Sequence, residues 1–236
     1  MKEVKEVKEV KEVKEVVGAD LAQPSFAYLL IKRTFDITAA GLGLIILSPL
    51  LAVVALLIYL EDKHSPIFKQ KRVGYKGKVF EIYKFRSMIP NAEQEIHKLQ
   101  HLNEIKGAMF KMSKDPRVTK VGHFIRKTSI DELPQFWNVV KGDMSLIGPR
   151  PALEREVAVY SERDKLRLNC IPGASGLWQI SGRSNLSFED MVNLDLYYIE
   201  HQSLWLDFKI FCKTIFIVVS SIISGLLKRS SKHGAY

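Results

Sequence analysis

The apolar stretch 35-FDITAAGLGLIILSPLLAVVALLIYL-60 decides the fold of this chain, because nothing else in it is as long or as free of charge. Asp36 carries the one charge in these 26 residues. A stretch of this length exceeds the roughly 20 residues that cross a bilayer core, so a spanning helix is the first interpretation. Ser48-Pro49 at the centre argues against a straight helix. Proline removes one helix hydrogen bond and bends the helix, and a serine hydroxyl can satisfy the carbonyl that is left free.

Basic residues flank the apolar stretch on both sides. Lys32 and Arg33 precede it, and residues 63–86 contain eight basic residues. Positive charge marks the cytoplasmic side of a membrane helix, so a single crossing would send one of these clusters across. A helix that enters, bends at Ser48-Pro49 and returns keeps both on one side, and each arm (35–47 and 50–60) is too short to span. The sequence therefore favours a re-entrant helix, with a plain transmembrane anchor as the alternative.

The chain divides into four predicted parts around this helix. Residues 1–24 form a low-complexity Lys-Glu-Val tail and linker, and residues 25–62 the membrane helix. Residues 63–202 form the catalytic domain. Residues 203–236 are apolar but interrupted by charge, which favours an interfacial amphipathic helix over a second crossing, with a core-packing helix as the alternative. The predicted fold class is α+β, a helix-rich monotopic membrane protein.

Composition limits the kinds of ligand that the chain could bind. The net charge is +9, and the five Lys and five Glu of the repeat cancel, so the excess lies elsewhere. Basic surface can bind nucleic acid, anionic lipid or phosphorylated substrates, and its position beside a membrane segment favours lipid and phosphate over nucleic acid. Cys170 and Cys212 lie far apart without metal-binding spacing, which fits a reducing compartment.

Local patterns predict the smaller elements of the domain. Residues 66–86 alternate β-formers with basic residues around a turn at Gly74–Gly77, which is typical of a β-hairpin. Helices are predicted over 91–106 and 187–202. The first would place His97 and His101 on one face, a spacing that could bind a metal but is more typical of a solvated face.

The segment 126-RKTSIDELPQ-135 carries the chemistry. Ser129 and Glu132 have capping-box spacing, which places Asp131 and Glu132 in the first turn of a helix of about 11 residues that Gly142 ends. Trp137 would face inward. Acids are common in a first turn because they complement the helix dipole, and that structural explanation is sufficient by itself.

A functional interpretation of the same segment stays open. A helix N-terminus binds anions, and Arg126 and Lys127 would keep Asp131 ionised. A carboxylate held in that way can attack phosphorus to form an acyl phosphate. Glu132 offers an oxygen ligand to Mg²⁺, which binds through one or two carboxylates together with substrate phosphates.

Two further cationic elements follow. Arg150 lies between Pro149 and Pro151, so its backbone has little freedom, and arginine suits bidentate phosphate contacts. A rigid structural turn is the alternative. The glycine-rich segment 172–183 ends in Arg183 and is a weak signal by itself.

Taken together and in order, these motifs closely resemble the bacterial sugar transferase family, the monotopic phosphoglycosyl transferases that initiate exopolysaccharide, capsule and O-antigen synthesis. The resemblance covers about residues 30–236. It rests on Lys32-Arg33 before the apolar helix broken at Ser-Pro, and on the motifs 84-KFRSM-88, 115-DPR-117, 126-RKTSIDELPQ-135, 143-DMSLIGPRP-151 and 176-GLWQ-179 with Gly182-Arg183.

The resemblance implies roles for the site residues. Asp131 would attack the sugar-bearing phosphate of a UDP-sugar and release UMP, and Glu132 would hold Mg²⁺ against the diphosphate. Arg126 and Arg150 match positions that hold phosphate. Lys84 and Arg183 match motif positions and are candidate substrate-binding residues. A polyprenyl (undecaprenyl) phosphate would then take the phosphosugar from the enzyme.

The resemblance also implies a location. The family fold is an α+β domain on a re-entrant helix at the cytoplasmic face of the bacterial inner membrane. The ending 204–236 resembles the exopolysaccharide branch, whose members often transfer galactose- or glucose-phosphate. Long relatives carry transmembrane helices and a further domain ahead of this unit, so the chain is expected to be a catalytic unit with a tail, and a homodimer stays open.

Two rival functions stay open. One is a non-catalytic membrane scaffold of a glycan assembly complex. The other is a metal-dependent transferase that moves sugar without phosphate, although the chain contains no Asp-x-Asp. The by-product separates the two chemistries, UMP for phosphosugar transfer and UDP for sugar transfer.

Overall fold

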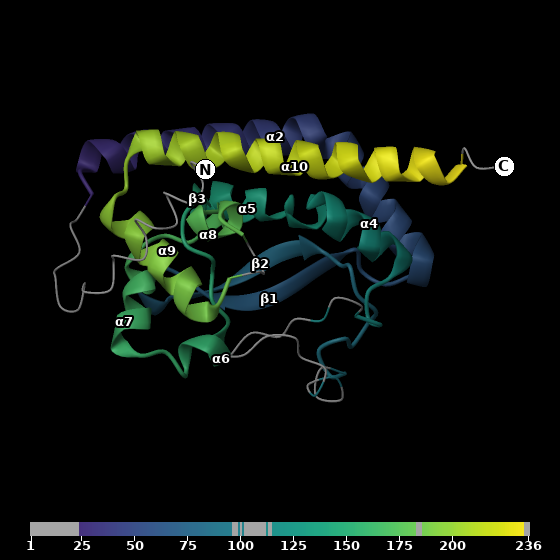
Figure 1. Ribbon diagram of the computed structural model, residues 1–236, viewed down its shortest axis with the longest axis horizontal. Helices are drawn as coiled ribbons and strands as arrows, with labels where there is room; N and C mark the ends of the chain where they lie inside the picture. Colours follow the sequence, from purple (N-terminus) through teal and green to yellow (C-terminus); the bar gives the residue numbers. More distant parts are fainter. Residues whose placement is uncertain are drawn as a thin grey trace.

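Two long helices form one side of the protein, and the shorter elements lie beneath them (Figure 1). The computed structural model describes residues 24–95, 99, 101, 112, 115–182 and 186–233, with backbone alone for 224–233. The long helices are α2 (Phe26–Asp62) and α10 (Leu204–His233). They are joined by an edge-to-face contact between Phe35 and Phe211. This arrangement confirms a helix-rich fold with one long apolar helix and little sheet, while the predicted tail lies outside the described residues.

Helix α2 passes through its proline without ending. Pro49 has no N–H for the carbonyl of Ile45, four residues earlier, and the hydroxyl of Ser48 donates to that carbonyl at 2.8 Å. Figure 1 shows the helix changing direction, so that its first part follows α10 and its last part turns toward α4 (Lys120–Thr128). Val54 and Ile58 in the last part pack against Ile125 of α4. By length and composition α2 is the one described helix that could cross a membrane.

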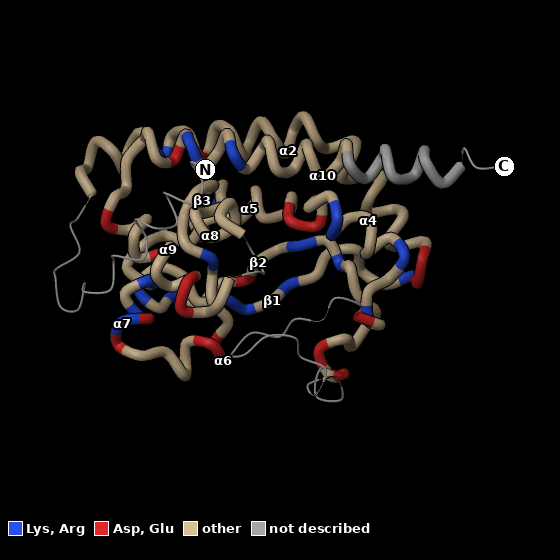
Figure 2. Tube along the Cα trace, viewed as in Figure 1, with Lys and Arg blue, Asp and Glu red and all other residues tan. Residues whose placement is uncertain are grey.

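Most exposed large apolar side chains lie on the two long helices. On α2, Ile45 and Ile46 are each 71% exposed, and on α10 Phe216 is 71% exposed. Figure 2 shows a long middle part of α2 without charged positions, whereas the shorter elements beneath carry many. Ile210, in contrast, is fully buried, so α10 has one face on the domain core and one apolar face in the open.

The predicted hairpin is confirmed. Strands β1 (Ile67–Val73) and β2 (Val79–Phe85) pair antiparallel, with a short 3₁₀ turn, η2 (Tyr75–Gly77), between them. Gly77 has a φ of +79°, a conformation that favours glycine. Phe80 and Ile82 point into the main core.

A second, parallel pair of three-residue strands was not predicted. It joins β3 (Ser145–Ile147) to β4 (Gly173–Ser175). A Cβ on Gly173 would lie 2.1 Å from the backbone nitrogen of Gly148, so the backbones meet where only glycine fits. The remaining elements are short: α6 (Glu154–Val157), α7 (Glu162–Lys165), η5 (Leu166–Asn169) and α8 (Leu177–Ile180).

The helix predicted over 187–202 is confirmed as α9 (Phe188–Glu200), which begins with a capping box at Ser187. The helix predicted over 91–106 is wrong at its start, because Asn91–Glu95 form turns. Most of its remainder, including His97 of the suggested metal pair, lies outside the described residues.

The predicted helix that begins at Ser129 is also wrong. Ser129 has a φ of 58° and makes no capping hydrogen bond through its side chain. The chain instead forms a 3₁₀ turn, η4 (Ile130–Glu132), and then a separate helix, α5 (Gln135–Lys141), which starts after Pro134 and ends at Gly142 as predicted. Because α5 begins later than predicted, Trp137 does not face inward and is 52% exposed.

Candidate active site

The left-handed residue Ser129 sets the position of the two acids. It ends α4 and reverses the chain, so η4 carries Asp131 and Glu132 back toward the end of β2. There the ammonium of Lys84 pairs with a carboxylate oxygen of Glu132 at 2.8 Å. Arg126 stands in the last turn of α4, directly before the reversal. Four predicted site residues therefore meet, although not on the helix N-terminus that the sequence suggested.

The surroundings of Asp131 raise its pKa to about 6. Burial is the main cause and the neighbouring charge of Glu132 the second, while Lys84 and Arg126 act in the opposite direction. The sequence predicted that neighbouring cations would keep Asp131 ionised. They do lower its pKa, but burial raises the pKa by more, so the net shift is opposite to the one expected. At pH 7 a group with this pKa is still ionised in about nine molecules of ten. The carboxylate is thus weakly solvated yet mostly charged, which suits a nucleophile.

Arg150 is held through both its guanidinium group and its backbone carbonyl. Its guanidinium pairs with Glu156 at 3.1 Å and lies over the ring of Trp178, 6.0 Å from the ring centroid. Its carbonyl accepts a hydrogen bond from Arg167, which forms a buried pair with Asp195. Arg150, Glu156 and Trp178 thus form a second cluster, whose ion pair differs from the Lys84–Glu132 pair beside Asp131. The sequence motifs did not indicate this pairing.

Arg72 interacts electrostatically with both clusters, because the charges of Arg150, Glu156 and Glu132 all act on it. No sequence motif identified Arg72 as a site residue. It is buried, and its guanidinium donates to the carbonyl of Pro151 at 3.1 Å and to the side chain of Gln70 at 2.7 Å. Its pKa is lowered to about 10, chiefly by burial and then by the charge of Arg150, while Glu156 and Glu132 act to raise it. The strand register holds the signal that could have found it. Arg72 lies opposite Phe80 and therefore on the inward face of the hairpin.

The last candidate, Arg183, lies outside the described residues. It follows Gly182, which has a φ of +138°. Its predicted role in substrate binding stays a prediction.

The two acids suit a magnesium ion that arrives with a substrate. Magnesium uses one or two carboxylates and completes its octahedral shell with water and substrate phosphates. Asp131 and Glu132 offer two adjacent carboxylates, and the charge of Glu132 raises the pKa of Asp131, a repulsion that a bound cation would relieve. The described residues contain no group of three or more potential ligands of the His, Cys, Asp and Glu types. Two adjacent carboxylates therefore fit Mg²⁺ as protein ligands that leave the rest of its shell to other oxygen donors.

An open apolar cleft of about 530 Å³ includes Pro134, three residues after Asp131, but neither of the two acids lines it. It runs between α2, the outward face of the hairpin and the start of α5. The lining residues are Leu44, Leu51, Ala55, Ile67, Lys69, Tyr83, Phe85, Pro134 and Trp137.

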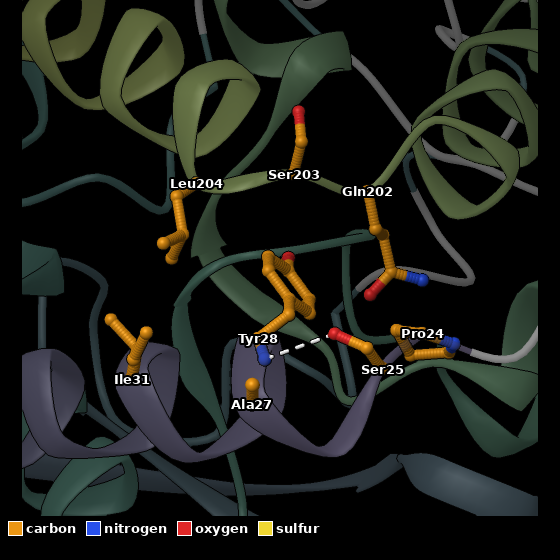
Figure 3. Close-up of a pocket in the computed structure, with 8 residues that line it drawn as sticks. All are labelled: Pro24, Ser25, Ala27, Tyr28, Ile31, Gln202, Ser203 and Leu204. Carbon is orange, nitrogen blue, oxygen red and sulfur yellow. Dashed lines mark hydrogen bonds between the residues drawn. The ribbon is translucent and has the colours of Figure 1, made fainter.

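A second open cavity, of about 410 Å³, lies between the starts of α2 and α10 (Figure 3). Tyr28 projects into the space between the two helices and donates to Asp207 at 2.8 Å, and Lys32 pairs with the same carboxylate at 2.8 Å. None of the candidate acids or arginines lines this cavity. Its contacts attach the beginning of the apolar helix to the domain.

Comparison with known proteins identifies relatives over nearly the whole described chain. A family model for bacterial sugar transferases matches residues 27–221. The chain is 48% identical over 195 residues to the galactosyl transferase CpsE of Streptococcus agalactiae, covering 82% of this chain and 43% of the relative. It is 43% identical over 209 residues to the undecaprenyl-phosphate galactose phosphotransferase of Salmonella typhimurium, covering 85% of this chain and 42% of the relative.

A shorter relative matches along most of its own length. The chain is 39% identical over 188 residues to the exopolysaccharide production protein ExoY of Rhizobium meliloti, covering 78% of this chain and 83% of the relative. The chain thus spans less than half the length of the two galactose transferases and corresponds to most of ExoY.

Proposed function

Because the chain belongs to the bacterial sugar transferase family, we propose that it transfers a sugar-1-phosphate from a UDP-sugar to undecaprenyl phosphate and releases UMP. This reaction would begin the assembly of an exopolysaccharide or related glycan. The arrangement of Asp131 supports it most directly. A partly buried carboxylate with a pKa of about 6 feels the charge of a second acid, Glu132, and of the cations Lys84 and Arg126.

In the first half-reaction, a carboxylate oxygen of Asp131 attacks the sugar-bearing phosphorus of the donor. The bond from that phosphorus to the bridging oxygen breaks, and its electron pair leaves with UMP. Arg126 and Lys84 lower the pKa of Asp131, so they favour its charged, nucleophilic form. The product is a covalent phosphosugar on Asp131.

A magnesium ion bound by Glu132 and the donor would neutralise charge on the diphosphate. Lys84 pairs with Glu132 at 2.8 Å and fixes the orientation of that carboxylate. The requirement for the metal is part of the proposal.

In the second half-reaction, a phosphate oxygen of the lipid carrier attacks the same phosphorus and frees Asp131. The apolar cleft supports a lipid acceptor, because it connects α2 to the wall formed by Pro134. Lys69 adds a cation to an otherwise apolar lining, which suits an isoprenoid chain with a phosphate head.

We also propose that α2 is re-entrant and that the domain faces the cytoplasm of a bacterial inner membrane. A helix of this length measures about 55 Å when straight, which would carry one end well beyond a bilayer core. Both ends instead bind the same domain. Lys32 pairs with Asp207 at 2.8 Å, and Asp62 at the far end accepts from Arg86 at 2.6 Å. Exposed Ile45, near the proline, would then lie deepest in the membrane.

The relatives guide the choice of sugar. CpsE and the Salmonella protein are named for galactose, while a relative in Aeromonas hydrophila, 45% identical over 202 residues, is named for N-acetylgalactosamine phosphate. We propose galactose-1-phosphate as the transferred group, with glucose-1-phosphate as the second candidate.

The decisive experiment separates the first half-reaction from the second. Purified protein is incubated with Mg²⁺ and each of several UDP-sugars without carrier, and intact mass and released nucleotide are measured. The true donor should add one phosphosugar, located at Asp131 by peptide mapping, and release UMP. The Asp131→Asn variant should do neither, while the control Glu81→Gln, which removes an exposed acid on β2 that pairs with Lys69, should react normally.

Other products would contradict the proposal. Release of UDP would indicate sugar transfer without phosphate. If no donor modifies the protein or yields UMP, even with undecaprenyl phosphate added, the proposed reaction is wrong. Normal product formation by the Asp131→Asn variant would exclude Asp131 as the nucleophile.

A further inference from the structure

Arg72 differs from the other buried arginines in having no carboxylate of its own. Arg117 is 5% exposed and pairs with Asp115 at 2.7 Å, and Arg167 is 3% exposed and pairs with Asp195. Arg72 is 8% exposed, and no carboxylate of the described residues lies within ion-pair distance of it. Its Nε is shielded from solvent and has no hydrogen-bond partner within the part of the chain that the structure describes. A buried cation without an anion is costly, so it requires an explanation.

The neighbourhood does not neutralise this charge. Glu156 is the buried carboxylate of the cluster, 1% exposed, and it is already occupied by Arg150 at 3.1 Å and by the backbone nitrogen of Leu153 at 2.8 Å. Glu156 therefore pairs with Arg150 and acts on Arg72 only through its charge, so Arg72 keeps a positive charge without an ion-pair partner among the described residues. The mutual repulsion is visible in the lowered pKa of Arg72, to which the charge of Arg150 contributes.

The geometry also connects the excess charge to the acids of the active site. Glu132 acts on Arg72 electrostatically, as does Glu156 from the other cluster. Arg72 holds the carbonyl of Pro151, and the next residue of β1 receives a hydrogen bond from the same loop, with the nitrogen of Val73 donating to Ala152 at 2.9 Å. The hairpin thus fixes Arg150 at a set position relative to Arg72.

We propose that Arg72 and Arg150 together form a phosphate subsite, and that it binds the nucleotide-side phosphate of the donor. Phosphate oxygens would accept from two planar guanidinium groups and offset the excess charge that Glu156 leaves. The assignment to the nucleotide-side phosphate rests on the proposed function. When the bridging bond breaks, the electron pair goes to this phosphate, and the two arginines stabilise the added charge. Arg72 is then a binding residue for the leaving UMP.

The test is nucleotide binding by the full chain in detergent or nanodiscs, without any turnover. UMP and inorganic phosphate are titrated by calorimetry, and the ligand-induced rise in Tm is recorded. The Arg72→Gln variant should bind UMP about tenfold more weakly or worse, as expected for loss of one charge-assisted hydrogen bond. The matched control is Lys71→Gln, an exposed neighbour on the opposite face of the same strand, which should bind UMP like the wild type.

A second variant covers the case in which Arg72→Gln does not fold. Glu156→Gln keeps both arginines and removes the carboxylate that pairs with Arg150 and acts on Arg72 through its charge, so inorganic phosphate should raise its Tm by more than it raises that of the wild type. An equal or smaller rise would overturn the subsite. So would wild-type UMP affinity in a folded Arg72→Gln protein, because a residue that only supports the Pro151 loop would alter the Tm without ligand and leave the UMP affinity intact.

The result is separable from that of the adduct experiment. If no phosphosugar forms on Asp131 but Arg72→Gln loses phosphate affinity, the proposed reaction fails and the anion site stands. If the adduct forms and Arg72→Gln binds UMP normally, the reaction stands and the subsite is wrong.

Discussion

Replacing Asp131 with Asn should abolish the reaction and stabilise the protein. Its folded-state pKa of about 6 lies above the ordinary value of 3.8, so the folded state favours the protonated, uncharged form. The ionised carboxylate therefore costs stability, and the cost grows as pH rises from below 4 through 6. At pH 7.5 the cost is about 3 kcal/mol, and at pH 4.5 it falls to about 1 kcal/mol. Neutral asparagine removes this cost.

The assay is chemical unfolding of wild type and variant at both pH values, in the same detergent and without nucleotide. The variant should be more stable at pH 7.5, and its advantage should shrink by about 2 kcal/mol at pH 4.5. Glu81→Gln is the matched control, because Glu81 is exposed, pairs with Lys69 and does not contribute to the pKa shift of Asp131, so its loss should bring no such gain. A variant that is less stable at pH 7.5, or an advantage that does not depend on pH, would refute the reasoning from burial.

Three further changes test other parts of the structure. Lys84→Met removes a cation that lowers the pKa of Asp131, so the pH midpoint of adduct formation should move above its wild-type value near 6 in a pH–rate series. Arg33→Met should lower the free energy of unfolding by about 2–3 kcal/mol in denaturant titrations, because its guanidinium donates to two carbonyls at the end of α5, at 2.6 and 2.9 Å. Gly148→Ala should prevent folding or cost more than about 4 kcal/mol, measured as yield and Tm, because its Cβ would lie 2.5 Å from a backbone carbonyl oxygen.

Elements governed by local patterns could be predicted from the sequence. The hairpin followed from alternation around Gly74–Gly77, and α9 from its apolar and aromatic positions. The long helix followed from composition, and the Ser48–Ile45 hydrogen bond shows how the helix passes its proline. In each case the determining contacts lie within a few residues of one another in the chain.

The helix predicted around the two acids was wrong for a physical reason. Ser129 and Glu132 have capping-box spacing, but the same spacing arises when the serine takes a left-handed conformation and ends the preceding helix. Pro134 then directly precedes the next helix, where its missing N–H costs no helix hydrogen bond. Which alternative occurs depends on the packing of α4 against α2, through Ile125 and Val54, and no local pattern encodes it.

The second arginine cluster could not be predicted because it depends on pairings distant in sequence. Strands of three residues, such as β3, are too short to show a period. Arg72 becomes a site residue only through the register that places it opposite Phe80 and through its bond to Pro151, 79 residues later. The pairing of β1 with β2 predicts that Arg72 lies on the inward face of the hairpin. The loop around Pro151 that contacts Arg72 is distant in sequence, so the contact itself could not be predicted.

Burial accounts for both unusual charges of the site. It raises the pKa of Asp131 and lowers that of Arg72, so each group is held in a place that disfavours its charge. The two could have neutralised one another, but η4 and β1 hold them in separate clusters, with Glu132 paired to Lys84 and Glu156 paired to Arg150. A substrate with a reactive phosphorus at the acids and a second phosphate at the arginines would match both clusters at once. If the proposed function holds, a donor diphosphate would offset the positive charge of the arginines, and its binding would then stabilise the folded protein.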